Sequence, residues 1–318
     1  MSKVRYYLIK SGGLSLFKQY WRAGVLFDAI CQFLLLGRDK TSLLMLREII
    51  ALKIQKKLQK KYSFVFKSID KEYVYSLPHD TTRIVWIFWW QGMDEAPSVV
   101  KICYQSVLSH LRDWNVVLIS QENYRDYTTF PDYIIEKLDK GIITLTHFSD
   151  LLRLDLLIKH GGLWLDATVL CTSGDIPLSI LNSELFYYQV LKPGADGKSM
   201  VMSSWCMYAK TNNLILIATQ KLLYEYWKKM NSLVDYFLIH QFFSISCSCY
   251  PEISKNVPPY CSSIPHILLL HLFDQYDEQY WNDLKKMTCF HKLSYKLDAE
   301  QCKEIGTYYD LIIKGRTL

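Results

Sequence analysis

Apolar and polar residues alternate in blocks through the second quarter of the chain, and these blocks have the lengths of strands and helices. Residues 83–90 form a nearly continuous apolar and aromatic run, as expected of a strand buried on both faces. A helix is expected over 97–111, a second strand over 114–119 and another helix over 131–140. This alternation predicts an α/β fold with a parallel, Rossmann-like sheet and a ligand site at the carboxyl ends of its strands.

A helical pattern also lies upstream, over residues 42–62, where apolar side chains recur at helical spacing and lysines crowd the later turns. The apolar positions are Leu43, Leu46, Ile50, Ile54 and Leu58, and the lysines are Lys53, Lys56, Lys57, Lys60 and Lys61. Two interpretations remain open. Either the helix packs on the main domain with its lysines in water, or the lysines dock it on an anionic membrane surface, each contributing about 1 kcal/mol.

The stretch from Ser149 to Thr168 combines a helix, a glycine turn and a short strand. Ser149 is a favourable N-cap, leucines fill the buried faces of the helix, and Gly161 supplies the left-handed residue that ends it. The strand Leu163–Leu165 then delivers Asp166 at its carboxyl end. The pattern therefore presents one carboxylate beside the start of a helix.

Three charged side chains of this stretch carry the candidate chemistry. Asp150 and Arg153 lie three residues apart, hence on one face of the first helical turn. A guanidinium among leucines needs a partner, and either Asp150 or a bound ligand can serve. Asp166 is placed to hold a hard divalent cation that neutralises a diphosphate. The alternative is that Asp166 only caps the following turn.

Composition narrows the class of protein. The chain has 318 residues, of which 50% are hydrophobic and 21% charged, so it can form a packed core and is not a disordered chain. Residues 1–71 hold 15 Lys and Arg against 4 Asp and Glu, and the remainder holds 22 against 27. No recognised nucleic-acid-binding motif accompanies the basic segment, so no nucleic-acid partner is expected. Nine cysteines, an odd number, argue against a disulfide scaffold.

Targeting and nucleotide-binding signatures are absent from the sequence. The longest apolar run, Val25–Leu36, is interrupted by Asp28 and Gln32 and is shorter than the ~20 residues that span a bilayer. Met1–Lys10 lacks the apolar stretch of a signal peptide, so we expect a cytoplasmic protein. The glycine motifs of dinucleotide-binding folds and P-loop NTPases are missing, and no paired-carboxylate hydrolase site is evident.

The pattern SDxLRxxLLxxxGGxWLDAT over residues 149–168 resembles the DXD region of retaining, GT-A fold glycosyltransferases. More narrowly, it resembles the capsular polysaccharide synthesis proteins related to the glycosyltransferase 32 group. The resemblance covers residues 82–296, and the strand at 84–92 is similar to the family's first strand, which ends in a tryptophan followed by a glycine. It implies a GT-A fold over 81–318, with a Rossmann-like mixed sheet flanked by helices. Residues 1–80 would form a basic, mostly helical N-terminal extension.

The resemblance also implies roles for five residues. In related enzymes the strand-end tryptophan stacks on the uracil of a UDP-sugar, which implies this role for Trp89. The helix Asp and Arg contact the donor sugar, which implies Asp150 and Arg153 as catalytic and donor-binding residues. The first DXD carboxylate, here Asp166, would reach Mn²⁺ or Mg²⁺ and the diphosphate. The second is Thr168 here, a weaker ligand for a hard cation, so metal affinity is lower, a water bridges or another side chain compensates.

Later segments resemble the family more loosely. His291 would complete the metal shell and Lys292 would pair with phosphate, with Lys296 as a further donor-binding candidate. Trp205 is expected as a wall on the acceptor side, and Asp235 as a polar contact to sugar.

The resemblance implies transfer of a hexose, galactose or else glucose, from a UDP-sugar to a lipid-linked or growing oligosaccharide, with retention of configuration, in bacterial capsular or surface polysaccharide synthesis. The acceptor would bring the protein to the inner face of the cell membrane as a peripheral protein, which the lysine-rich helix fits. Two alternatives stay open. One is a catalytically degenerate protein of this fold that binds a nucleotide-sugar or glycan, suggested by Thr168. The other is a non-enzymatic membrane-surface scaffold.

Overall fold

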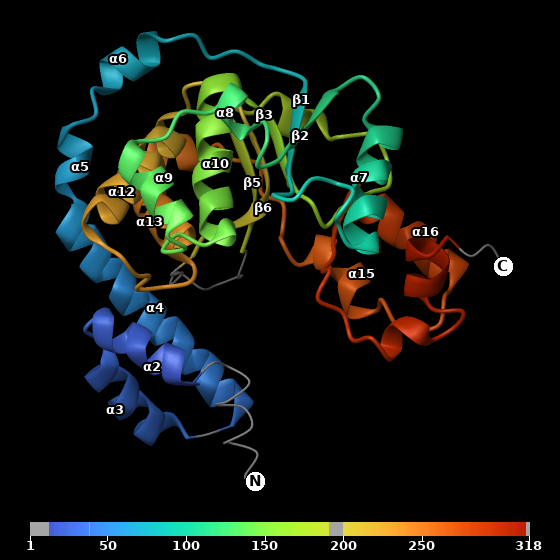
Figure 1. Ribbon diagram of the computed structural model, residues 1–318, viewed down its shortest axis with the longest axis horizontal. Coiled ribbons are helices and arrows are strands. Elements are labelled where there is room, and N and C mark those ends of the chain that lie inside the picture. Colours follow the sequence, from blue (N-terminus) through green and yellow to red (C-terminus); the bar gives the residue numbers. More distant parts are fainter. Residues whose placement is uncertain (1–12, 38, 191–199, 316–318) are drawn as a thin grey trace.

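The computed structural model describes residues 13–37, 39–190 and 200–315. Its main sheet contains β1 (Ile84–Phe88), β2 (Asn115–Ile119), β3 (Gly162–Asp166), β5 (Leu185–Gln189) and β6 (Met202–Ala209). The strand order is β2-β1-β3-β6-β5. β1 pairs in parallel with β2 and β3, whereas β6 runs antiparallel to β3 and β5 (Figure 1). The sheet is therefore mixed, as expected, and its first three strands form the parallel half.

Helices cover both faces of this sheet (Figure 1). One face packs against α7 (Ser98–His110), and the other against α9 (Asp132–Asp139), α10 (Leu145–His160), α12 (Leu214–Lys229) and α13 (Leu238–Cys249). Successive residues of β1 point to opposite faces. Val85 and Ile87 join an apolar cluster with Val100 of α7, whereas Trp86 joins the cluster of the other four helices. The expected sheet flanked by helices is confirmed.

The elements expected from the apolar pattern are present with small shifts at their ends. Those in the second quarter of the chain are β1, α7, β2 and α9, and their bounds differ from the expected ones by at most two residues. The helix expected to begin at Ser149 starts earlier, because Thr144 is the N-cap of α10. Ser149 lies within the helix and its hydroxyl donates to the carbonyl of Thr146. The buried Phe148 extends the apolar face upstream.

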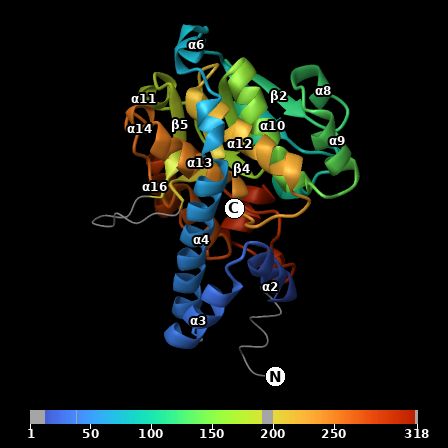
Figure 2. The same ribbon diagram turned by 90° about the vertical axis from the view of Figure 1, so that its left-hand side faces the viewer.

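The N-terminal region is helical over its described part. It contains α2 (Gly13–Arg22), α3 (Leu26–Leu36), α4 (Lys40–Tyr62), α5 (Phe64–Lys67) and α6 (Lys71–Ser76). Figure 2 shows α4 running from the α2–α3 pair up to the main body. Its apolar stripe is buried in the same cluster as α12 and α13, and Tyr62 meets Phe242 of α13 edge-on, with ring centroids 5.5 Å apart. The division at residue 80 stays a prediction. Residues 1–12, which include Met1–Lys10, lie outside the described residues.

The C-terminal part adds a second, two-stranded sheet, in which β4 (Val169–Cys171) pairs antiparallel with β7 (Phe290–Lys292). Helices α15 (Ile267–Leu270) and α16 (Glu278–Met287) lie beside it (Figure 1). The remaining short elements are α8 (Tyr124–Tyr127), α11 (Leu178–Leu181), α14 (Pro251–Ser254), 3₁₀ turns at Ile264–His266 and Gln301–Lys303, and a π-helical turn at Tyr309–Ile313. The pairing of β4 with β7 brings Val169 opposite Lys292, two residues that lie far apart in the sequence.

Two expectations about the whole chain can be compared with the structure. None of the nine cysteines, all of which lie within the described residues, forms a disulfide. Burial raises the pKa of Cys103 and Cys171 to about 12, so these thiols are unreactive near pH 7. Across the described ranges, no helix has both the length and the apolar character that a bilayer crossing requires.

Candidate active site

Asp166 is the last residue of β3 and lies at the carboxyl edge of the parallel half of the sheet, opposite Phe88 of β1. The chain reaches β3 through Gly161 and Gly162, which both have positive φ. A Cβ at Gly162 would collide with the carbonyl of Ile84 on β1, so only glycine lets the turn lie this close to the sheet. The turn fixes the position of β3 and thereby of the Asp166 carboxylate, which is partly exposed.

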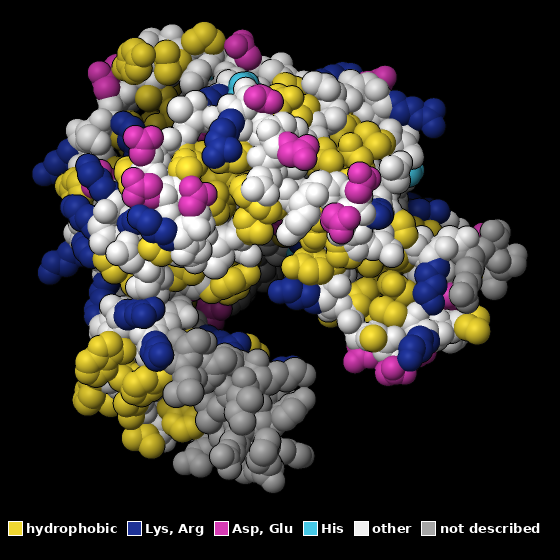
Figure 3. Space-filling model, viewed as in Figure 1, with side chains coloured by type: hydrophobic (Ala, Val, Ile, Leu, Met, Phe, Trp, Pro, Cys, Tyr) yellow, Lys and Arg dark blue, Asp and Glu magenta, His cyan; other side chains and the backbone are white. Residues whose placement is uncertain are grey.

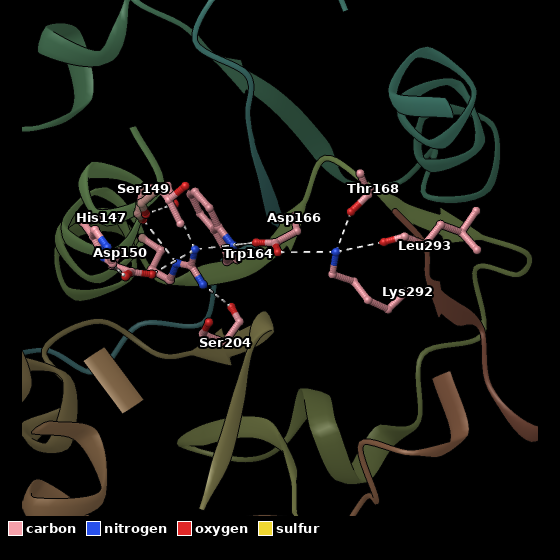
Figure 4. Close-up of polar contacts among 11 residues, drawn as sticks. His147, Ser149, Asp150, Trp164, Asp166, Thr168, Ser204, Lys292 and Leu293 are labelled. Atoms are coloured by element: carbon pink, nitrogen blue, oxygen red, sulfur yellow. Dashed lines mark hydrogen bonds and ion pairs between the residues drawn. The ribbon is translucent and has the colours of Figure 1, made fainter. Parts of the chain in front are cut away.

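Arg153 of α10 is nearly buried, and its guanidinium has partners in several directions (Figure 4). Nη1 donates to the carbonyl of Ser204 at 2.6 Å. Nη2 lies 3.3 Å from Oδ1 of Asp150 and 3.6 Å from Oδ1 of Asp166. The guanidinium carbon lies over the ring of Trp164, 4.9 Å from its centroid. The partner that the sequence left open is therefore Asp150, and the same cation also reaches the strand-end carboxylate.

Lys292 of β7 brings a second cation to Asp166. Its Nζ lies 3.7 Å from Oδ2 of Asp166, and it donates to Oγ1 of Thr168 and to the carbonyl of Leu293 at 2.5 and 3.1 Å (Figure 4). Asp166 thus lies between Arg153 and Lys292, with one cation near each carboxylate oxygen. Thr168, which stands where a DXD motif has its second carboxylate, accepts a hydrogen bond from this lysine instead.

His147, which the sequence analysis did not single out, lies beside Asp150. Its Nδ1 is 3.5 Å from Oδ2 of Asp150, and its ring is buried. A helix that starts at Ser149 leaves His147 outside. With the helix extended to Leu145, the three-residue spacing of His147, Asp150 and Arg153 places all three on one face, and this spacing is the signal that could have found it.

Two side chains from the segment after α12 also lie near the charged cluster. The ring of Tyr236 packs edge-on against His147, with centroids 5.6 Å apart, and the side chain is 57% exposed. Partial desolvation, and then the charges of Asp150 and Asp166, raise the pKa of Tyr236. Burial lowers the pKa of His240 to about 4, so this imidazole is neutral at pH 7. Its Nδ1 is buried with no hydrogen-bond partner among the described residues.

Trp89, the expected uracil platform, follows β1 at the same edge of the sheet. Its ring meets Tyr295 edge-on, with centroids 5.4 Å apart, and its Nε1 is buried without a partner in the described part of the chain. The ammonium of Lys296 lies 5.7 Å from the centroid of the Tyr295 ring. Trp89 and Lys296 therefore share Tyr295 as a neighbour. The next tryptophan, Trp90, packs against Phe148 of α10 in the core.

The structure does not bring His291 to this group. Neighbouring residues of a strand point to opposite faces, and Lys292 takes the face toward Asp166. The His291 ring instead lies 5.4 Å from that of Trp281, and its Nε2 lies 3.3 Å from Oγ1 of Thr172. Burial lowers the pKa of His291 to about 4. The resemblance implied that His291 and Lys292 both belong to the donor site. Because they are neighbours on strand β7, their side chains point to opposite faces.

The carboxylate of Asp235 is buried and used within the protein. It accepts hydrogen bonds from the backbone N–H of Phe237 and from Nε2 of Gln241, both at 2.9 Å. Burial raises the pKa of Asp235. These contacts fix the entry to α13, and the side chains of Tyr236 and Phe237 beside them are exposed.

Trp205, expected as an acceptor-side wall, is almost fully buried. Its ring stacks on Tyr188 with centroids 4.7 Å apart and an interplanar angle of 16°. Its neighbour Ser204, through the carbonyl that Arg153 binds, is the closer link from β6 to the charged cluster. A separate cavity of about 280 Å³ has Tyr188 in its lining, together with Ser173, Asp175, Tyr260, Lys285, Lys286 and Thr288, among others.

A divalent cation at Asp166 would find few protein ligands. No group of three or more His, Cys, Asp or Glu side chains within residues 13–37, 39–190 and 200–315 is arranged to hold a metal. Asp166 offers one partly exposed carboxylate and Thr168 a hydroxyl nearby. Mg²⁺ commonly binds through one or two carboxylates together with waters and substrate phosphates. These residues therefore fit an ion that arrives with a diphosphate, and they do not form a cage of their own.

The fold and this site define a class of protein, namely a mixed α/β protein whose charged cluster lies at the carboxyl ends of parallel strands, where such folds bind ligands. Within this class, the chain belongs to the family described as capsular polysaccharide synthesis protein, whose sequence profile matches residues 40–312. The match includes α4 and every site residue described above, and it leaves out α2 and α3.

Two proteins illustrate what the chain is similar to. O-glycosyltransferase braB of Annulohypoxylon truncatum is 29% identical over 102 residues, which cover 28% of this chain and 24% of that protein. The match thus spans about a quarter of the relative's length. A solved structure of the PaToxG glycosyltransferase superposes with a TM-score of 0.38 at 16% identity, covering 84% of this chain and 97% of the other.

Proposed function

We propose that this protein is a retaining GT-A hexosyltransferase, related to the glycosyltransferase 32 group, that acts in bacterial capsular or surface polysaccharide synthesis. It would move a hexose, galactose or else glucose, from a UDP-sugar to a lipid-linked or growing oligosaccharide. Family membership and the glycosyltransferase relative support the reaction class. The observation that carries the proposal is the Asp166 carboxylate held between Arg153 and Lys292 at the carboxyl edge of the sheet.

In this proposal the donor lies along that edge. Trp89 stacks on the uracil, and Lys292 pairs with the diphosphate. Asp150 and Arg153 bind the hexose. The Thr168 hydroxyl already accepts a hydrogen bond from the Lys292 ammonium, so little reorganisation is needed when phosphate arrives. The ammonium of Lys296 lies near the ring of Tyr295, which contacts Trp89, and it would add a second positive charge on the uridine side.

Charge placed in advance around a leaving group is usually the largest single contribution to catalysis. We propose that Mn²⁺ or Mg²⁺ accompanies the diphosphate, with Asp166 and Thr168 as its protein ligands. A metal bound there would act as a Lewis acid on the departing UDP. Arg153 and Lys292 keep the Asp166 carboxylate oriented toward the donor, and Lys292 offsets charge that develops on the leaving group.

The acceptor hydroxyl would attack from the face that UDP leaves, which retains the anomeric configuration. No residue is assigned as a covalent nucleophile. Since Trp205 and Asp235 are buried, we propose the exposed Tyr236 as the side chain that meets the acceptor. Its ring packs against His147, which contacts Asp150, and this supports a position of Tyr236 beside the proposed sugar side of the cluster.

The direct test is slow hydrolysis of a panel of UDP-sugars, with and without Mn²⁺, in the absence of acceptor. We expect one UDP-hexose to be hydrolysed and Asp166→Asn to lower the rate by about 100-fold or more. Asp139→Asn, at the exposed end of α9, is the control for removing an acidic charge and leaves the rate unchanged. An Asp166→Asn variant as fast as the wild type would refute the proposal.

One alternative is favoured by a specific observation. The Thr168 hydroxyl accepts a hydrogen bond from Lys292, and Thr168 supplies no second carboxylate, as in a protein that binds a nucleotide-sugar without turning it over. Such a protein would show a UDP-induced rise in melting temperature and no hydrolysis of any UDP-sugar. A membrane-surface scaffold would show neither the rise nor hydrolysis, whereas a transferase shows both.

A further inference from the structure

The end of the molecule formed by α2, α3 and the first turns of α4 carries many large apolar side chains in contact with solvent (Figure 3). We call it the apolar tip. Its exposed side chains are Phe17, Trp21, Phe27, Ile30, Leu34, Leu35, Leu44, Met45 and Ile49. The most exposed are Leu35 at 79%, Phe27 at 78% and Leu34 at 71%. Scattered single exposures are ordinary on a protein surface, but a concentration at one end indicates a binding surface.

The exposed positions follow the helical repeat, which makes each helix two-sided. Phe27, Ile30 and Leu34 lie on one face of α3, and Met45 and Ile49 lie one turn apart on α4. The opposite face of α4 is used for the core, since Leu46, Ile50 and Ile54 are buried there. The outward apolar face is therefore additional to the face that packs the helix on the main body.

Basic residues accompany the apolar ones. Lys18 and Arg22 of α2, and Lys40 and Arg47 of α4, are exposed on the same helices. Figure 3 shows dark blue side chains along α4 directly above the yellow surface of the tip. The segment 1–71 carries 15 basic against 4 acidic residues. Apolar side chains bordered by a basic surface complement a bilayer with anionic headgroups.

Two of the α4 lysines have a different role from the one that the sequence suggested. Lys53 is paired with Asp28 of α3, and Lys57 donates to the carbonyls of Ala23 and Gly24 in the turn between α2 and α3. These contacts hold the α2–α3 pair against α4. The lysines therefore fix the shape of the tip, and the apolar side chains provide its outward surface.

The tip is also joined to the candidate active site. Nε2 of Gln19 on α2 donates to the carbonyl of Val234 at 3.1 Å, directly before the buried Asp235 and the exposed Tyr236. A membrane or protein surface bound by the tip would thus lie close to Tyr236, which we assign to the acceptor.

We propose that the apolar tip inserts into the interface of an anionic lipid bilayer and holds the protein there. Phe27, Leu34 and Leu35 enter the boundary between headgroups and acyl chains, while the basic residues pair with the headgroups. This inference uses only the N-terminal helices and goes beyond the proposed reaction. The apolar surface of α2 and α3 lies outside residues 40–312, which the family profile matches.

The test is flotation of the full chain with phosphatidylcholine vesicles that contain or lack phosphatidylglycerol. We expect binding to the anionic vesicles, and a loss of about tenfold or more in partition coefficient for Leu34→Glu combined with Leu35→Glu. Leu178→Glu on α11 is the matched control, because Leu178 is 71% exposed like Leu34 and lies far from the tip (Figure 2). As a second measurement, brominated lipid should quench a fluorescence component that Trp21→Phe removes.

Several outcomes would overturn the proposal. Equal binding of the Leu34/Leu35 variant and the wild type would do so, as would equal binding to vesicles without phosphatidylglycerol. A dimer in sedimentation that the tip substitutions dissociate, with no vesicle binding, would identify a second copy of the chain as the occupant. Hydrolysis of UDP-sugar in solution should be the same in the tip variants, so failure of docking and failure of the proposed function can be told apart.

Discussion

At the scale of single residues, Arg153 links more parts of the site than any neighbour described above. Its planar guanidinium contacts two carboxylates, a backbone carbonyl and an indole ring at the same time. Lysine has one compact charge in place of this fork and cannot meet partners in so many directions. A substitution of Arg153 by lysine therefore tests whether the planar guanidinium, and not its positive charge alone, organises the site.

We expect Arg153→Lys to lower kcat/KM for the donor by about 100-fold, because Asp150 and Asp166 lose their common partner while net charge is kept. The measurement is steady-state hydrolysis of the preferred UDP-sugar. Arg125→Lys, an exposed arginine on α8, is the control and should have wild-type kinetics. Unchanged kinetics in Arg153→Lys would show that positive charge alone suffices.

At the scale of elements, the turn from α10 into β3 decides where Asp166 lies. Gly162 has a φ of +95° and its backbone lies against the carbonyl of Ile84, whereas Gly141 has a φ of +67° with open space around it. Both glycines have a positive φ, which disfavours other residues. Gly162 in addition leaves no space for a Cβ.

We expect Gly162→Ala to lower the free energy of unfolding by about 3 kcal/mol or more, since strain and a backbone collision add together. Gly141→Ala, with strain alone, should cost about 1 kcal/mol. Urea unfolding of both variants measures the difference. Equal losses would mean that β3 can move away from β1 without cost.

The sequence predicts these elements well where the signal is local. The apolar run of β1, the proline at the start of α7 and the glycine after α10 each mark an element within the segment itself. The sequence places the start of α10 at Ser149, four residues beyond its true start at Leu145. The polar Ser149 is a good cap, and the residues before it include the polar His147. The helix extends upstream since Phe148 is buried among the aromatic rings of Tyr124 and Trp90.

The site was predictable only in part, for a related reason. Asp150, Arg153 and Asp166 lie in one short stretch whose spacing places them together. Tyr236 and His240 come from a distant segment in which the resemblance indicated only Asp235, whose carboxylate is used within the protein. Which of His291 and Lys292 faces Asp166 depends on the register in which β7 pairs with β4, and pairing between strands so far apart in sequence has no local signature.

At the scale of the whole molecule, a buried neutral histidine makes stability depend on pH. Burial lowers the pKa of His291 to about 4, whereas an unfolded histidine titrates near 6.5. Between these values the unfolded chain binds more protons than the folded one. The stability that depends on a neutral His291 is therefore complete above pH 6.5 and falls as the pH is lowered toward 4.

We expect the free energy of unfolding to drop by up to about 3 kcal/mol between pH 7 and pH 4 through this residue, and His291→Phe to remove that part of the drop. Urea unfolding at a series of pH values measures it. His110→Phe, at the exposed end of α7, should leave the pH dependence as it is. A wild-type slope in His291→Phe would show that other groups control acid unfolding.

Lys292 lies on β7, in the two-stranded sheet that is separate from the main sheet, and this position has a consequence for biosynthesis. Ribosomes make chains from the N-terminus, so β1 to β6, with Trp89, Arg153 and Asp166, emerge and can fold long before β7 exists. During that interval Asp166 has only one of its two cationic neighbours. On the proposed reaction, a growing polypeptide therefore lacks the lysine that pairs with the diphosphate until β7 has emerged and paired with β4.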